Sequence, residues 1–527
     1  MRFILGFLAA LALSTPALAD WHVAESDHFV IYADDSEKDI ARFAEMLERY
    51  HAAMSFVTQR EVEVPSPSNR VTIYAVGSSR AITKLADAKN VGGFYIPRAG
   101  GSVAFVPDVR PSYGELSWSM TVLLHEYAHH FLIGSARFAM PRWMDEGGAE
   151  FFASARFPKS GEVHIGRPAN HRAAELTYAP SVSIETLFER GNIGREGGNA
   201  RDDFYGRSWA LYHLLTFDEE RKGQLLDYAT RIAGGDSSID AARGAFGDLD
   251  VLSRDIDSYL KQRKLFGFVL QPERLPIGDI TVRRLSQGMG EMLPVIIRSK
   301  RGVDREEAAE VLVDAREVAA QFPADPGVLA ALAEAEYDAG NDAEAIAAAD
   351  AALAIDPARK NALVQKGYAL FRMAGEADDA DAAFAAAMKP FTALNRLEND
   401  HPLPLIYYYR SFVERGVEPN DNARHALERA ANLSPFDRSL SMNAGLMQAR
   451  EGKIALAMHT LGPVASNPHG GRMARAAQRY LDDLATVSEG TEWQPKRTIN
   501  LADALAAAVA EGDGEDEGEE DREDSGD

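Results

Sequence analysis

The sequence predicts two structural classes in one chain, an α+β domain in the first half and an all-α solenoid of helical repeats in the second. Before residue 270, segments rich in β-branched and aromatic residues alternate with segments of helical periodicity, which is typical of an α+β domain. After about residue 300, alanine-rich helical stretches recur at a regular interval, which is typical of stacked helix pairs. Within the first half, the apolar segment 123–131 contains a His-Glu-x-x-His motif, which indicates metal chemistry.

The N-terminal residues are typical of an exported protein. Arg2 precedes an apolar run at residues 3–13, and the triplet Ala-Leu-Ala at 17–19 supplies small residues for a cleavage site. This order is that of a secretory signal peptide, so we expect residues 1–19 to be removed after Ala19. The run is too short for a stable membrane anchor. The mature protein is expected in a bacterial periplasm or outside the cell, and the chain has 0 cysteines with which to form disulfides.

The net charge of −24 is unevenly distributed along the chain. Residues 511–527 contain eleven acidic residues and one arginine, a net charge of −10. Such a run cannot bury apolar surface, so we expect a tail over residues 488–527 that is disordered from residue 511 onward. A solubilising role and weak binding of divalent cations are both consistent with it. A strongly acidic chain without a basic, aromatic-lined strip is not expected to bind nucleic acid.

Residues 20–270 are expected to form the α+β domain. Residues 28–32 and 71–76 have the β-branched and aromatic composition of strands. Between them, apolar residues recur at every third or fourth position, as a helix with one buried face requires. These residues are Ile40, Phe43, Leu47, Tyr50 and Met54. Residues 92–106 combine two glycine pairs with two short apolar runs, which predicts a hairpin.

The His-Glu-x-x-His motif places two imidazoles and a carboxylate on one helix. His125 and His129 are four residues apart, so they lie on the same helix face, where both can bind one metal ion. Glu126 is next to the first of them and can take a proton from a water molecule that the metal holds. Without a metal, these polar groups would be buried on an apolar helix with too few partners. The motif therefore predicts a catalytic zinc site with Glu126 as the general base.

A second motif supplies the carboxylate that such a site needs as a third ligand. Residues 141–152 read Pro-Arg-Trp-Met-Asp-Glu-Gly-Gly-Ala-Glu-Phe-Phe, an apolar helical segment with three acidic residues. Together the two motifs resemble those of gluzincins, the thermolysin-like and aminopeptidase N-like zinc metallopeptidases, and especially their peptidase MA-like relatives. The resemblance is specific over about thirty residues and implies a zincin-like fold that hydrolyses peptide bonds.

The resemblance implies that Glu146 is the third zinc ligand. Sixteen residues separate His129 from Glu146, fewer than in the aminopeptidases, which predicts a tighter connecting loop. Glu150, one helical turn later, is the alternative ligand. Otherwise it orients a ligand histidine by a hydrogen bond, a role that Asp145 can also fill.

The same resemblance suggests roles for two further segments. It places the hairpin at 92–106 beside the substrate cleft, where a peptide can add as an extra strand, although the residues alone are equally consistent with an ordinary sheet edge. Residues 204–215 are expected to form another helix of this domain. Gluzincins commonly place a tyrosine or histidine beyond the third ligand to stabilise the oxyanion, which assigns this role to Tyr205. A packing role for Tyr205, and binding of a substrate carboxylate by Arg207, are the alternatives.

Residues 271–302 contain prolines and glycine and are expected to connect the two domains. Residues 303–487 are expected to form the solenoid, because helical stretches recur about every thirty-four residues, as in tetratricopeptide repeats. The unit at 326–359 resembles that repeat best. Its matching positions are Leu329, Leu332, Ala333, Gly340, Ala345, Ala352 and Pro357. Three weaker units follow, and the pattern stops at Lys389-Pro390, which predicts an interruption of the solenoid from there to His401.

The sequence therefore predicts an exported zinc metallopeptidase whose solenoid binds a peptide or protein substrate or a partner protein. Zn²⁺ is the expected cofactor, held by His125, His129 and Glu146. The alternative is a periplasmic adaptor in which the solenoid binds partners and an inactive peptidase-like domain serves as a scaffold. A zinc hydrolase that acts on cell-wall peptide cross-links is a third hypothesis that the motif allows.

Overall fold

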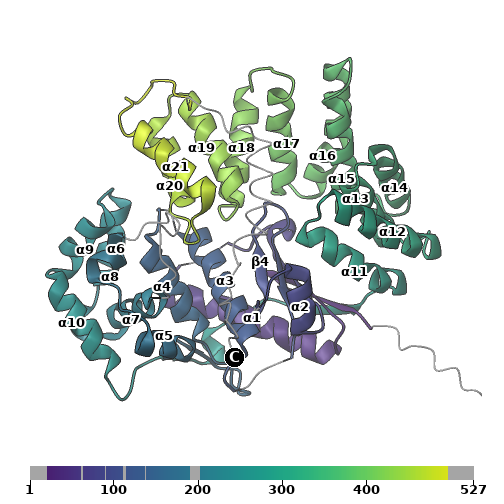
Figure 1. Cartoon of the computed structure of the whole chain (residues 1–527). Coiled ribbons are helices and arrows are strands. Elements are labelled where there is room, and N and C mark those ends of the chain that lie inside the picture. The colour runs from purple at the N-terminus through teal and green to yellow at the C-terminus, as the bar shows by residue number, and fades with distance from the viewer. Residues whose placement is uncertain are drawn as a thin grey trace, which may run out of the picture.

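The computed structural model describes residues 20–60, 63–89, 91–110, 114–136, 138–189 and 202–495. Figure 1 shows a lower half, in which helices surround a β-sheet, and an arc of paired helices above it. The expected signal peptide at 1–19 and the acidic run at 511–527 lie outside the described residues, so both stay predictions. No helix in the described part of the chain has the length and apolar character that a membrane span requires.

A mixed sheet is the framework of the first half, and its six strands among the described residues have the order β4-β5-β3-β2-β1-β8. Strands β2, β3 and β5 run parallel, while β4 is antiparallel to β5 and β1 is antiparallel to both β2 and β8. The segments predicted as strands form β2, β3 and the β4–β5 hairpin, whereas β1 was not predicted and β8 falls in the segment predicted as the domain connection. The strands are β1 His22–Glu25, β2 Phe29–Ala33, β3 Val71–Ala75, β4 Phe94–Ile96, β5 Val103–Val106 and β8 Thr281–Arg284.

One face of the sheet is covered by α1, Glu37–Thr58, and by α3, Trp118–Ser135. All five apolar residues that predict the buried stripe of α1 are fully buried. The Tyr50 hydroxyl in this stripe donates a hydrogen bond of 3.0 Å to the Leu124 carbonyl of α3. The burial of α1 therefore also fixes the position of the helix that carries the His-Glu-x-x-His motif.

The opposite face of the sheet is covered by α2, Ser79–Ala86, and by α11, Gln287–Arg301. Leu293 of α11 belongs to the same apolar cluster as Phe105 of β5. Helix α11 also packs against the first repeat helices. It therefore joins the sheet to the solenoid through a shared core.

The segment at 271–302 is not the simple connection that the sequence predicts. Its strand β8 pairs with β1 and completes the sheet, and its helix α11 is the first helix of the solenoid. The first half therefore extends beyond residue 270, and the helical stack begins before residue 303. The sequence did not indicate this arrangement because β8 is short and mostly exposed, and its partner strand lies at the other end of the half.

The all-α prediction for the C-terminal half is confirmed, because paired helices follow one another from α11 to α21 (Figure 1). Small residues allow the pairs to approach closely. A Cβ on Gly367 in α15 would lie 2.6 Å from the Phe391 ring of α16. The helices after α11 are α12 Arg305–Gln321, α13 Pro326–Asp338, α14 Asp342–Ile355, α15 Lys360–Ala374, α16 Ala380–Leu397, α17 Pro402–Val413, α18 Asp421–Leu433, α19 Arg438–Arg450, α20 Ile454–Ala465 and α21 Gly471–Leu484.

The predicted interruption of the solenoid after Lys389 is wrong, because α16 continues through Pro390. Phe391 and Leu394, which follow the proline, are fully buried. The Phe391 ring stacks on Tyr407 of α17 with the centroids 4.4 Å apart. Burial of these side chains offsets the loss of the backbone hydrogen bond that proline cannot donate.

A helical lobe completes the first half and contains the helix expected at 204–215. This helix is α7, Phe204–Phe217, and it packs closely on α4, Arg142–Ala153. Gly147 makes the contact possible, since a Cβ there would lie 2.4 Å from the Ser208 carbonyl oxygen of α7. The other elements are α5 Ala173–Tyr178, α6 Ile184–Glu189, α8 Gln224–Ala233, α9 Ser238–Phe246, α10 Leu249–Leu260, β6 Val163–Ile165, β7 Phe268–Leu270 and the 3₁₀ turns Pro67–Asn69, Asn170–Arg172, Glu219–Arg221 and Pro272–Arg274.

Substitution of Gly147 tests the contact between α4 and α7. Gly147→Ala is expected to lower the free energy of unfolding by about 1–3 kcal/mol, because the added methyl group pushes the two helices apart. The midpoint of urea unfolding, followed by the fluorescence of Trp143 on α4 and Trp209 on α7, measures the loss. Gly134→Ala in α3 is the control, because its added Cβ has no atom within 4 Å. Equal midpoints for the two variants would contradict the close contact.

Candidate metal centre

Two helices position the candidate site. Helix α3 begins after Ser117, whose side chain accepts a hydrogen bond from the Met120 amide, and carries the His-Glu-x-x-His motif in its middle. Helix α4 begins after Pro141 and is buried from Trp143 to its last residue. Because α4 is buried on all sides, its acidic side chains cannot reach solvent. They lie next to the histidines of α3 instead.

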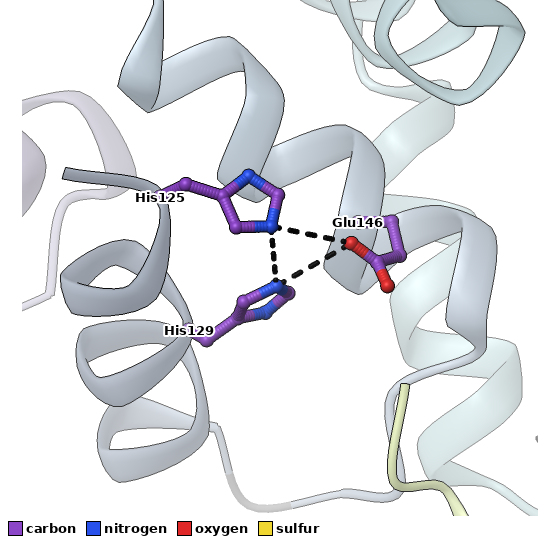
Figure 2. A group of neighbouring side chains, drawn as sticks. All are labelled: His125, His129 and Glu146. Carbon is purple, nitrogen blue, oxygen red and sulfur yellow. Dashed lines mark hydrogen bonds and ion pairs between the residues drawn. The ribbon is translucent and has the colours of Figure 1, made fainter. Parts of the chain in front are cut away.

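His125, His129 and Glu146 converge on one point (Figure 2). The Nε2 atoms of the two histidines are 3.0 Å apart. Glu146 Oε2 lies 3.5 Å from His125 Nε2 and 3.4 Å from His129 Nε2. Throughout the described ranges, this is the group of metal-ligand atoms that all lie within 4.8 Å of one another. Two imidazole nitrogens and a carboxylate oxygen are the protein ligands of many catalytic zinc sites.

Carboxylates behind the two histidines set the direction of both rings. His129 Nδ1 donates a hydrogen bond of 2.9 Å to Asp145, and His125 Nδ1 lies 3.3 Å from Glu150 Oε1. A proton held on each Nδ1 leaves a lone pair on each Nε2, so both rings point their donor atoms at the same place. Glu150 therefore lies behind His125, and Glu146 lies in front of it.

These residues fit a bound divalent cation. Two lone pairs that face each other at 3.0 Å repel unless a proton or a metal ion lies between them. Glu146 is 0% exposed, and neither of its carboxylate oxygens has a hydrogen-bond partner among the described residues. Burying a carboxylate without such a partner is unfavourable. A cation shared by the carboxylate and the two imidazoles removes both costs.

In the metal-free chain, the charges of the site are strongly coupled. Burial opposes the charged form of His129, but Asp145 and Glu146 beside it raise its pKa well above the usual value. Burial also opposes the charged form of Glu146, but the two histidines hold the pKa of this carboxyl well below the usual value. A proton therefore binds where a metal ion can bind, and metal binding is expected to release it.

Glu126 lies on the side of α3 that faces strand β4. It lines a small hollow together with Gly93, Phe94 and Tyr95. Burial raises the pKa of Tyr95, and the negative charge of Glu126 raises it further. Glu126 is not one of the converging ligand atoms, although it is next to His125 in the same helix.

Tyr205, which the resemblance assigns to the oxyanion, lies close to Glu146 and to two arginines. Its hydroxyl accepts a hydrogen bond of 3.3 Å from Arg142, and the Arg172 guanidinium lies over its ring, 4.7 Å from the centroid. The charge of Glu146 and burial together raise the pKa of Tyr205 to about 12. The phenol therefore stays protonated at neutral pH and can donate a hydrogen bond.

Arg207 does not reach the site. Its guanidinium bonds to Asp257 at 2.9 Å and to Ser181 at 3.1 Å, and the residue is 5% exposed. Both terminal nitrogens of Arg207 are hydrogen-bonded within the helical lobe and its Nε is buried, so the structure does not support the alternative in which Arg207 binds a substrate carboxylate.

Three further residues reach the site although no sequence motif marks them. His171 and Arg172 both bind Glu150, the latter with 2.9 Å between its Nε and Glu150 Oε1. His469, in the turn between α20 and α21, has its ring centroid 5.6 Å from that of His129. In the sequence, the only feature that could have indicated His171 and Arg172 is that a histidine and an arginine are adjacent there. His469 had no such feature, because only the fold brings the end of the solenoid to α3.

No family model and no curated protein matches the sequence. Solved structures to which the chain is similar include helical-repeat proteins. A thermophilic TPR protein of Thermus thermophilus has 13% identity and a TM-score of 0.31, over 38% of this chain and 100% of its own. MamA from Desulfovibrio magneticus has 16% identity and a TM-score of 0.27, over 38% of this chain and 97% of its own. Yeast Tom70 has 13% identity and a TM-score of 0.25, over 60% of this chain and 72% of its own. Scores this low do not assign the chain to a family, and its repeat architecture rests on its own helices.

Substitution of Glu150 tests its interactions with His125, His171 and Arg172. Burial raises the pKa of Glu150, but His171, His125 and Arg172 lower it to about 2. A lowered pKa means that Glu150 stabilises the fold above its ordinary pKa of 4.5 and that this contribution is lost as the pH falls toward 2. Glu150→Gln is therefore expected to destabilise metal-free protein by about 3 kcal/mol at neutral pH. The difference in melting temperature from wild type should narrow between about pH 5 and pH 3.

The control for this prediction is Glu115→Gln, which removes an exposed ion pair with Arg167. Such a pair contributes about 0–1 kcal/mol, so melting should change little at any of these pH values. A Glu150→Gln difference that stays constant with pH would contradict the lowered pKa.

Proposed function

We propose that the chain is an exported, zinc-dependent metallopeptidase that hydrolyses peptide bonds. The observation that carries the proposal is the convergence of His125 and His129 on Glu146, a fully buried carboxylate without a hydrogen-bond partner among the described residues. These three side chains would hold the zinc ion. Bound zinc supplies a Lewis acid that polarises a substrate carbonyl and makes water acidic enough to lose a proton near neutral pH. The resemblance of both motifs to those of gluzincins supports the same function.

The side chains around the three ligands have separate tasks in this proposal. The Glu126 carboxylate takes the proton of the attacking water and later delivers it to the nitrogen of the leaving amine, so no covalent intermediate forms. Asp145 and Glu150 hold the two imidazoles in orientation. The Tyr205 phenol donates a hydrogen bond to the carbonyl oxygen as that oxygen gains charge.

Strand β4 offers a place for an extended peptide substrate. One of its edges pairs with β5. At the other edge, Phe94, Tyr95 and Ile96 make no backbone hydrogen bond to the rest of the described chain. Glu126 lines the same hollow as Phe94 and Tyr95, so a peptide added to this edge by main-chain hydrogen bonds would pass the general base.

A second candidate function is that of a periplasmic adaptor, and the helical-repeat half favours it. A cavity of about 1070 Å³ lies between the outer face of the sheet and the first repeats. Tyr32 and Tyr74 line it from the sheet, and Met289 and Arg359 line it from the repeats. A segment of a partner protein can bind in such a cavity. Because an adaptor needs neither a metal ion nor Glu126, metal content and hydrolysis distinguish the two functions.

Metal content is the first measurement that separates them. Untagged protein without residues 1–19 is expected to contain one zinc ion per chain by mass spectrometry, because the donor set is complete. His129→Ala removes one of three ligands and should lose the metal, while His459→Ala, exposed on α20, should retain it. Folded protein that stays metal-free after zinc is supplied would exclude the peptidase and leave the adaptor.

Replacing the Glu126 carboxylate with the amide of glutamine tests the role of this residue. Glu126→Gln is expected to retain zinc and to hydrolyse an unfolded protein about 10²–10⁴-fold more slowly, because the amide cannot accept the proton of water. The rate of cleavage at saturating substrate measures this loss, and Glu185→Gln, exposed on α6, is the matched control. Full activity of Glu126→Gln would exclude the mechanism. Cleavage of purified peptidoglycan, with no cleavage of unfolded protein, would indicate a cell-wall hydrolase.

A further inference from the structure

The C-terminal repeats lie against the first half along one side of the metal centre. Ser68 binds Glu398 through its amide at 2.9 Å and its hydroxyl at 2.6 Å. Next to it, Asn69 accepts a hydrogen bond of 3.1 Å from the Ser434 hydroxyl. These contacts are partly buried or buried, so the repeats are fixed to the edge of the first half and do not merely follow it in the chain.

One turn of the solenoid packs beside the centre, and another contacts one of its histidines. In the turn before α19, Asp437 accepts a hydrogen bond of 2.9 Å from the amide of Ala99, just beyond β4, and the Phe436 ring lies 4.5 Å from that of His130. The turn between α20 and α21 carries His469, whose ring meets that of His129 edge to face at 5.6 Å. Figure 1 shows this turn descending from the yellow helices toward α3 and α4.

His469 faces the centre without belonging to its ligands. Its ring makes no hydrogen bond to any other residue that the structure describes, and its side chain is exposed to solvent. Its nitrogen atoms are not part of the group that lies within 4.8 Å. The imidazole therefore packs against the ligand His129 from the side of the solenoid, with its own nitrogen atoms unbonded.

We propose that His469 is a specificity-determining residue, which limits the size of the substrate side chain that can lie over His129. This inference rests on the proposed peptidase function and adds its substrate class, an extended peptide with a small side chain at that position. A chain that runs along β4 and past Glu126 has to pass beneath the two turns of the solenoid. Phe436 is buried against His130, so its side chain cannot move aside for a substrate. The ring of His469, which makes no hydrogen bond, is therefore the group that a substrate side chain would contact.

Binding of two zinc-chelating probes tests the proposal without relying on hydrolysis. The probes are acetyl-alanine hydroxamate and acetyl-phenylalanine hydroxamate, and their dissociation constants are measured by calorimetry on the zinc-loaded full chain. Wild type is expected to bind the alanine probe at least about tenfold more tightly, since steric discrimination in a pocket has this magnitude. His469→Ala should reduce this preference to less than about threefold. His469→Trp, which fills the space, should weaken binding of the alanine probe as well.

The control is His459→Ala, which replaces an exposed histidine on the helix before the same turn and should leave the preference unchanged. An unchanged preference in His469→Ala would overturn the proposal. So would an equal gain for both probes, because His469 would then block access without selecting a side chain. If neither probe binds zinc-loaded wild type, the two turns of the solenoid block access to the centre, and the proposal also fails. Wild type that binds no zinc at all would show by its metal content that the proposed function itself is wrong.

Discussion

Two imidazole lone pairs and one buried carboxylate meet at a single point, and this unfavourable arrangement is held in place by the layers of packing around it. The Nε2 atoms of His125 and His129 are 3.0 Å apart, and Glu146 is buried beside them without a hydrogen-bond partner among the described residues. The ring directions depend on protons held at Nδ1, and Asp145 and Glu150 hold those protons. Glu150 is fixed in turn by Arg172 and His171. The helix that carries these carboxylates can approach α7 only because Gly147 has no Cβ. Each layer of packing therefore orients the layer inside it.

The solenoid is attached to the first half at both of its ends. Helix α11 shares an apolar cluster with the sheet, and the turns before α19 and α21 contact His130 and His129 at the candidate metal centre. A helical repeat stack is held by contacts between neighbouring units, so its two ends keep a defined separation. The first half and the stack therefore restrain each other, and the space above the centre is shaped by both. This physical link unites the proposed catalytic and binding roles in a single substrate path.

Local patterns predicted those features that depend on nearby residues. The apolar stripe of α1, the hairpin of β4 and β5, and the helical nature of the second half follow from periodicities of two or about 3.6 residues. Local patterns failed where distant contacts decide the outcome. At Pro390 the sequence shows the lost hydrogen bond, and only the fold shows the burial of Phe391 that offsets it. Strand β8 was predicted as part of a connection because its partner β1 lies at the opposite end of the half.

By itself, the sequence determined the kinds and the spacing of the reactive groups. His125 and His129 share a helix face with Glu126 next to them, because the geometry of one helical turn requires it. Only the tertiary structure decided that Glu146 lies in front of the imidazoles and Glu150 behind them, that Arg207 is bound elsewhere, and that His469 reaches the centre. The reason is physical. Hydrogen bonds within a helix fix neighbours in the chain, whereas the direction in which two packed elements present their side chains depends on the burial of the whole core.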